Sequence, residues 1–179
     1  MKRIVIRYGI IAGLIVAAWC VGAIALCYSR NNFEGNMLLG YASMILAFSF
    51  IFVGVKSYRD QEQNGFISFG KAFKIGLFIS LVASIIYVIA WLIDYYLFIP
   101  DFMEKYTAHV LKQTQAEGIS QIELNKKAAE MTSYKEMYEN PLLVVLITYS
   151  EILPVGLIIS LISALLLKRK AESNVVVAN

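Results

Sequence analysis

Four long apolar runs, with a single charged residue among them, decide what this chain can fold into. They cover residues 8–28, 36–55, 75–93 and 142–167. Each run is about 19 residues or longer, enough for a helix to cross a hydrocarbon core of roughly 30 Å. Lipid offers backbone groups no hydrogen-bonding partner, so helices are the expected form. The chain, with 59% hydrophobic residues, is predicted to be an all-α four-helix transmembrane bundle that forms one membrane domain over residues 1–179.

Basic residues predict the direction of these spans. The short flanks on one side carry a dense set of cations: Lys2, Arg3, Arg7, Lys56, Arg59, Lys71, Lys74, Lys168, Arg169 and Lys170. The other side holds Arg30 and the long segment 94–141, whose acidic residues outnumber its lysines. Basic flanks stay in the cytoplasm, so both termini are predicted there and segment 94–141 outside.

The first span also has features of a signal peptide. A small-residue cleavage pattern, Ala23-Ile24-Ala25, follows a basic start and an apolar run. Cleavage would leave three spans and place the new N-terminus outside. The apolar run continues unbroken to Tyr28, which favours an uncleaved first span.

Segment 94–141 predicts an outer helical hairpin over residues 100–139, with helices over 100–117 and 121–139. Its signals are a proline suited to a first helical turn, a glycine break, a capping box and an Asn-Pro stop: Pro100, Gly118, Ser120 with Glu123, and Asn140-Pro141. The apolar stripes of the two helices are interpreted as packing on each other or on the bilayer rim. The alternative is a surface that binds a partner.

Aromatic and basic residues alternate just before the third span. Phe66, Phe69 and Phe73 recur at helical spacing, and Lys71 and Lys74 fall on other faces. This pattern is typical of a cationic helix start in the inner membrane interface, where anionic lipids are plausible ligands. The alternative is an anchor that only fixes topology.

Glu151 is the one charged residue inside the four runs. At 1.5 Å per residue it lies about 14 Å from the start of its span, near the midplane. A carboxylate at that depth costs at least ~2.5 kcal/mol. Glu151 must therefore be neutral, paired or in contact with water.

Other polar residues are expected at a similar depth. They are Ser43, Ser84 and Tyr87 on other spans, with Tyr149 and Ser150 adjoining Glu151. Pro154 cannot donate to the Ser150 carbonyl and should kink the helix. Convergence of these groups would resemble a proton or cation site. The structural alternative is a protonated Glu151 that hydrogen-bonds across helices.

Small residues recur every four positions on the fourth span, at Gly156, Ser160 and Ala164. Such a face lets helices approach closely. Because Ser160 falls roughly opposite Glu151 on an ideal helix, the face is predicted to point toward lipid or a second copy of the chain. A homodimer through the fourth span is therefore expected.

Several classes of function are not expected. The sequence shows no nucleophile–base pair, metal-ligand cluster or phosphate-binding loop, so neither enzyme activity nor a cofactor is predicted. It has no basic stripe on a soluble domain, so nucleic acid is not an expected partner. The one histidine, His109, and the two cysteines, Cys20 and Cys27, are interpreted as structural.

Three segments carry a family resemblance. They are NGFISFGKAFKIG from Asn64, GYASMILAFSFIFVG from Gly40 and EILPVG from Glu151. They resemble a family of small Bacteroidota membrane proteins, the domain-of-unknown-function family numbered four-one-nine-nine. The resemblance implies four spans in a bacterial inner membrane and supplies no activity or site residue.

Two functions remain open from the sequence. The leading interpretation is a non-enzymatic inner-membrane subunit, adaptor or modulator that acts through helix–helix assembly, with itself or another membrane protein. The alternative is a small proton- or cation-linked transporter that uses Glu151.

Overall fold

A computed structural model describes residues 1–30, 33 and 37–169. Its elements are α1 (Lys2–Arg30), α2 (Met37–Glu62), α3 (Phe69–Ile93), the π-helical turn η1 (Asp94–Phe98), α4 (Phe102–Ala116), α5 (Gln121–Glu139) and α6 (Pro141–Leu167). Within these ranges the extended pairing is limited to one isolated bridge, between Ile67 and Arg169. The predicted all-α class is confirmed.

Four helical segments are long and apolar enough to cross a membrane: Lys2–Arg30, Leu38–Glu62, Phe69–Phe98 and Pro141–Leu167. The four predicted spans are therefore confirmed, although the helices extend beyond the predicted ranges, the fourth by one residue. The predictions stopped at the first charge, whereas a helix keeps its internal hydrogen bonds after it leaves the lipid. Asn36, Lys170 and the C-terminal tail lie outside the described residues.

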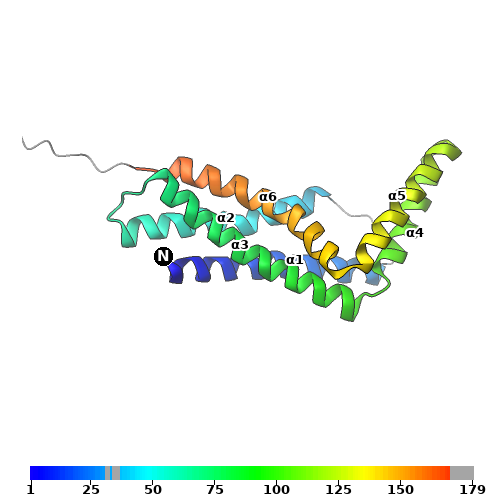
Figure 1. Cartoon of the computed structure of the whole chain (residues 1–179), viewed down its shortest axis with the longest axis horizontal. Coiled ribbons are helices and arrows are strands. Elements are labelled where there is room, and N and C mark those ends of the chain that lie inside the picture. Colours follow the sequence, from blue (N-terminus) through cyan, green and yellow to red (C-terminus); the bar gives the residue numbers. More distant parts are fainter. Residues whose placement is uncertain (31–32, 34–36, 170–179) are drawn as a thin grey trace, which may run out of the picture.

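The bundle is built around α3, which contacts α1, α2 and α6. Figure 1 shows these helices side by side along the long axis. The centre of the core consists of fully buried large side chains from α2, α3 and α6: Phe48, Ile51, Ile75, Ile79 and Ile152. Ile51, Ile75 and Ile79 lie in the half of the bundle toward the chain's described ends, called the packed half below, whereas Ile152 adjoins Glu151.

Close helix approach depends on small residues that face α3. Gly9 and Gly13 of α1 lie against Val82 and Ile86, with no room for an added Cβ. On α6, the face formed by Gly156, Ser160 and Ala164 is buried against the bundle. The prediction that this face points outward is therefore wrong. The small residues let α6 approach α3 within one chain and leave this face unavailable to a second copy.

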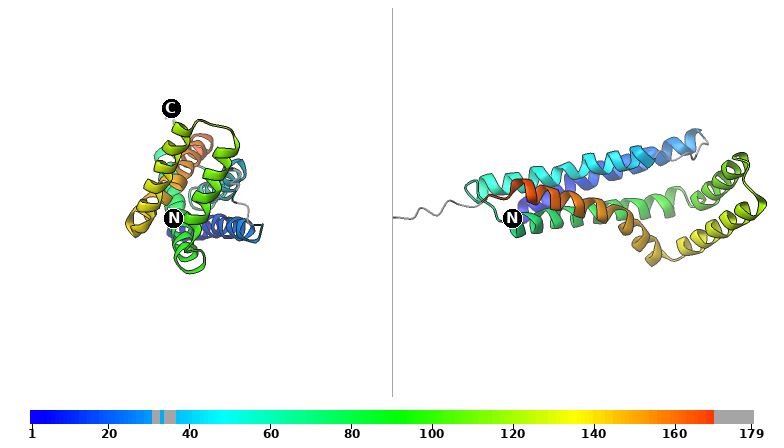
Figure 2. Two further views of the ribbon diagram at one scale, coloured as in Figure 1. Left: turned by 90° about the vertical axis from the view of Figure 1, so that its right-hand side faces the viewer. Right: turned by 90° about the horizontal axis from the view of Figure 1, so that it is seen from above.

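Helices α4 and α5 form the predicted hairpin, which projects beyond the bundle (Figure 2). The capping box is confirmed: Ser120 accepts from the Glu123 backbone N–H, and the Glu123 carboxylate accepts from that of Ser120. Asn140 caps α6, with Pro141 in its first turn. The first hairpin helix begins at Phe102 rather than at residue 100, because a turn joins the Phe102 N–H to the Ile99 carbonyl.

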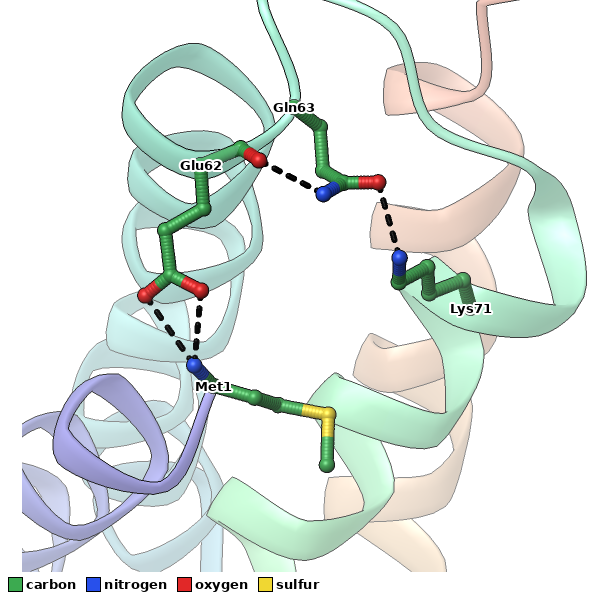
Figure 3. Close-up of polar contacts among 4 residues, drawn as sticks. All are labelled: Met1, Glu62, Gln63 and Lys71. Atoms are coloured by element: carbon green, nitrogen blue, oxygen red, sulfur yellow. Dashed lines mark hydrogen bonds and ion pairs between the residues drawn. The ribbon is translucent and has the colours of Figure 1, made fainter.

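The opposite end, here called the terminal end, holds Met1 and Arg169. The Met1 ammonium lies 2.8 and 3.0 Å from the two Glu62 carboxylate oxygens, and Lys71 donates to the Gln63 side chain at 2.8 Å (Figure 3). The backbones of Ile67 and Arg169 exchange hydrogen bonds of 3.0 and 2.9 Å. The described ends of the chain thus share one end of the bundle, and the hairpin occupies the other.

The aromatic and basic segment at the terminal end belongs to α3 from Phe69 onward, whereas Phe66 precedes the helix. Ser68 caps the helix, so Phe69 is its first residue, and the Phe69 and Phe73 rings stack at 6.1 Å. Phe66 remains partly exposed beside the Arg169 guanidinium. Lys74 is exposed, whereas the Lys71 ammonium lies over the Tyr58 ring. The segment is a cationic helix start, as the sequence indicates.

Candidate functional site

A cavity of about 630 Å³ lies where the bundle meets the hairpin. We call it the junction cavity. Five helices line it: α1 with Cys20 and Ile24, α3 with Tyr87 and Trp91, α4 with Phe102, Met103 and Tyr106, α5 with Lys127, Met131, Tyr134 and Tyr138, and α6 with Ile147, Thr148 and Glu151. Residues that are far apart in the sequence, from Cys20 to Glu151, therefore line one cavity.

Glu151 supplies the carboxylate of the junction cavity. Its side chain is exposed although it lies in the middle of a transmembrane helix. In the part of the chain that the structure describes, it makes no hydrogen bond and no ion pair, so the cross-helix bond expected for a structural role is not seen. The carboxylate is thus available to whatever enters the cavity.

The thiol and the threonine hydroxyl of the lining have partners within the protein. The Cys20 thiol lies 3.8 Å from the Tyr87 hydroxyl, and the Thr148 hydroxyl donates to the Val144 carbonyl at 2.7 Å. Burial, and after it the charge of Glu151, raises the pKa of Tyr138 above its ordinary value. Tyr138 therefore stays a neutral phenol beside the carboxylate.

Aromatic rings form most of the cavity wall. The lining includes six aromatic side chains: Tyr87, Trp91, Phe102, Tyr106, Tyr134 and Tyr138. The Trp91 and Phe102 rings meet edge to face at 5.4 Å, and Phe102 stacks on Tyr106 at 5.7 Å. These contacts join the end of α3 to α4, so the hairpin itself completes the wall.

The one cation in the lining is already paired. The Lys127 ammonium lies 3.1 Å from the Glu130 carboxylate, and both side chains are exposed. Glu151 is consequently the one charged residue of the lining that has no counter-ion among the described residues. The site combines a free carboxylate with electron-rich ring faces, and both attract cations.

The structure brings only part of the predicted polar set together. Tyr87 and Glu151 line the same cavity. Ser43 is buried and donates to the Gly40 carbonyl, and Ser150 donates to the Ile147 carbonyl. Ser84 is fully buried within α3, with no partner for its hydroxyl among the described residues. These three serines lie outside the cavity lining.

Tyr149 and Pro154 also lie outside the lining, on either side of Glu151 along α6. Pro154 stands inside the helix, where it removes the hydrogen bond to the Ser150 carbonyl. Figure 2 shows α6 bending along its length. The bend directs the Glu151 half of α6 away from the packed half of the bundle and toward the hairpin.

Sequence reasoning missed the contribution of the hairpin to this site. Phe102, Tyr106 and Tyr138 lie on the apolar stripes of the hairpin helices, for which the sequence favours packing, and Trp91 lies in the third apolar run. Their meeting with Glu151 depends on the angle between the hairpin and the bundle, for which the sequence carries no signal. A search of residues 1–30, 33 and 37–169 finds no group of three or more His, Cys, Asp or Glu placed to hold a metal.

Comparison with protein families gives a match over most of the chain. Residues 7–169 match the family described as Protein of unknown function (DUF4199). Searches of curated proteins and of solved structures find no match.

Proposed function

The chain belongs to the DUF4199 family of proteins of unknown function, and we propose that it is a non-enzymatic membrane protein that binds an organic cation in the junction cavity. The observation that carries this proposal is the Glu151 carboxylate, which faces a largely aromatic cavity and has no partner among the described residues. The membrane setting is supported by four helices that are long and apolar enough to cross a membrane.

The chemistry of the cavity favours a cation with an apolar body. A carboxylate attracts positive charge, and ring faces of Tyr and Trp stabilise a cation by roughly 0.5–2 kcal/mol each. The apolar part of the ligand would contact Ile24, Met103 and Met131. A volume of about 630 Å³ lies within the usual range of roughly 300–1,000 Å³ for small-molecule sites. The ligand class is therefore an amphipathic quaternary or aromatic ammonium.

Binding rather than catalysis is proposed because of what surrounds Glu151. General acid–base or nucleophilic chemistry uses groups that activate one another at hydrogen-bond distance. In the described lining Glu151 is the single carboxylate, and the Cys20 thiol faces the neutral Tyr87 phenol. We expect the ligand to leave unchanged. The protein then acts as a sensor, subunit or modulator whose hairpin responds to the ligand.

The membrane setting belongs to the same proposal. We place the protein in the bacterial inner membrane with both termini in the cytoplasm, because the terminal end carries Lys2, Arg3, Arg7, Lys56 and Lys74. Anionic lipid headgroups would contact this end through Lys71 and Lys74, with Phe66, Phe69 and Phe73 in the interface. The junction cavity would then face the outer side.

A small transporter is the second candidate, and the position of Glu151 beside the Pro154 bend favours it. Transport would require the packed half around Ile51 and Ile79 to open alternately with the junction cavity. Proteoliposomes loaded with a pH-sensitive dye distinguish the two functions. We expect no cation-driven proton flux, and a flux that disappears in Glu151→Gln would replace binding by transport.

The proposal is tested by comparing three ligands of similar size on protein in lipid nanodiscs. Benzyltrimethylammonium is the cation, benzyl alcohol the neutral compound and benzenesulfonate the anion. We expect saturable binding of the cation alone, weakened at least about tenfold in Glu151→Gln, which corresponds to about 1.4 kcal/mol. Glu136→Gln, which removes an exposed carboxylate from hairpin helix α5, outside the cavity lining, is the matched control. Equal binding of all three ligands would overturn the proposal.

A further inference from the structure

A second cavity of about 630 Å³ lies between α1 and the end of α3. We call it the α1–α3 groove. Its lining is mostly apolar: Val21, Ile24, Ala25, Ala90, Ile93, Phe98 and Ile99, together with Tyr28 and Asp94. Ile24 also lines the junction cavity, but the groove has its own acidic residue and contains no part of the hairpin.

Asp94 is the unusual member of this lining. Its side chain is only 7% exposed, and its Oδ2 atom is buried without a hydrogen-bonding partner among the described residues. Among the described residues, Asp94 is also the only charged residue that is buried. An unpaired buried carboxylate is costly, and this groove is lined by a residue whose carboxylate has an oxygen without a partner among the described residues.

The nearest polar groups of the groove are already committed elsewhere. The Tyr28 hydroxyl donates to the Asp101 carboxylate at 2.7 Å, and the Lys105 ammonium lies 2.7 Å from the other Asp101 oxygen. Lys105 also covers the Tyr28 ring at 4.4 Å. These three residues satisfy one another, which leaves Asp94 as the free acceptor of the groove.

The surroundings of the groove identify the kind of ligand. Leu97 and Phe98 are 72% and 73% exposed beside it, at the end of the transmembrane segment Phe69–Phe98. Exposed apolar side chains at that level face lipid, so the groove opens toward hydrocarbon while Asp94 lies near the headgroup level. A hydrocarbon chain matches the apolar walls, and a cationic headgroup matches the carboxylate.

We propose that the α1–α3 groove is a binding site for a lipid with a primary ammonium headgroup. The ammonium donates a hydrogen bond to Asp94 Oδ2, and part of an acyl chain lies along Val21, Ala25 and Ala90. A primary ammonium suits this site better than a quaternary one because Oδ2 needs a donated hydrogen. The site is independent of Glu151 and of the junction cavity.

Native mass spectrometry of the detergent-solubilised protein tests this site. Phosphatidylethanolamine, phosphatidylcholine and phosphatidylglycerol are added separately, and dodecylamine represents a free amine. We expect one phosphatidylethanolamine per chain, retained at least about tenfold better than phosphatidylcholine, which has no ammonium hydrogen. Asp94→Asn should lose this preference, whereas Asp101→Asn and Glu151→Gln should keep it.

A stability measurement separates lipid binding from a structural role of Asp94. Without added lipid, Asp94→Leu should unfold at the same temperature as the parent protein or higher, because it removes an unpaired buried carboxylate. Added phosphatidylethanolamine should raise the unfolding temperature of the parent protein alone. Equal lipid retention by Asp94→Asn, or unfolding of Asp94→Leu at a lower temperature, would overturn the proposal. Retention of dodecylamine without phosphatidylethanolamine would overturn the lipid as its occupant.

Discussion

Gly156 on α6 lies so close to Ser80 on α3 that a Cβ added to the glycine would overlap the serine hydroxyl. The Ser160 hydroxyl, one turn further along α6, donates to the Gly156 carbonyl at 2.7 Å, and Ser160 faces Gly76 of α3. Small residues on both helices thus form the interface between α3 and α6. This interface holds the half of α6 that follows Pro154, the proline at the bend.

Gly156→Leu should therefore destabilise the single chain. Overpacking at such a contact costs about 1–3 kcal/mol or more, so we expect a lower unfolding temperature in nanodiscs and a loosened α6. Gly22→Leu is the matched control, because a Cβ at Gly22 meets open space. A Gly156→Leu variant that keeps the stability of the parent protein but loses a dimer would contradict the packing described here.

The transmembrane spans and the hairpin could be predicted because their signals are local. Long apolar runs define spans, and the Ser120 cap and the Asn140-Pro141 stop define hairpin ends. The inward face of α6 could not be predicted, because large apolar residues lie on every side of that helix. Lipid and protein core select the same side chains there, so periodicity does not distinguish them.

For a related reason, the sequence predicts only part of the candidate site, namely Glu151 and Tyr87. Glu151 stands out because a carboxylate in an apolar run is costly wherever it points. Trp91, Phe102 and Tyr138, which line the same cavity, look in the sequence like ordinary interface or packing residues. Only the position of the hairpin brings them near Glu151. Asp94 looked like the charge that ends the third span, and its burial depends on η1 and on the packing of α1.

The orientation in the membrane is predicted by the basic terminal end. In a background with Cys20 and Cys27 replaced by serine, a cysteine at Gln115 should react with a membrane-impermeant maleimide added from outside. A cysteine at Gln61 should react only after permeabilisation. Both positions are exposed helical residues, so they differ mainly in the side of the membrane. The reverse labelling pattern would invert the proposed topology.

Asp101 joins the hairpin to α1 through a pH-dependent contact. Hydrogen bonds from Lys105 and then from Tyr28 lower the pKa of Asp101 below its ordinary value of 3.8. The pKa of Asp101 is lower in the folded protein than in the unfolded chain. The contact therefore stabilises the docked hairpin fully at pH values above the ordinary pKa, and this stabilisation is lost as the pH falls through the lowered pKa.

Spin labels at Gln115 and Gln61 should therefore give the same distance distribution at neutral and mildly acidic pH. The distribution should broaden only in strong acid, and Asp101→Asn should broaden it already at neutral pH. Glu117→Gln, a change at an exposed carboxylate on the same hairpin, should have no effect. A distribution that broadens as the pH is raised would contradict the sign of this linkage.

The central claim, that Glu151 draws an organic cation into the junction cavity, is tested most directly through Trp91. The chain has two tryptophans: Trp19 is 46% exposed, whereas Trp91 is 7% exposed and lines the cavity. In a Trp19→Phe variant, Trp91 fluorescence reports on the cavity alone. N-benzylpyridinium quenches indole on contact and carries the required charge, and acrylamide is the neutral quencher. We predict saturable quenching by the pyridinium that becomes at least about tenfold weaker in Glu151→Gln, with acrylamide quenching unchanged. Pyridinium quenching that is linear and equal with and without the Glu151 carboxylate would contradict the account.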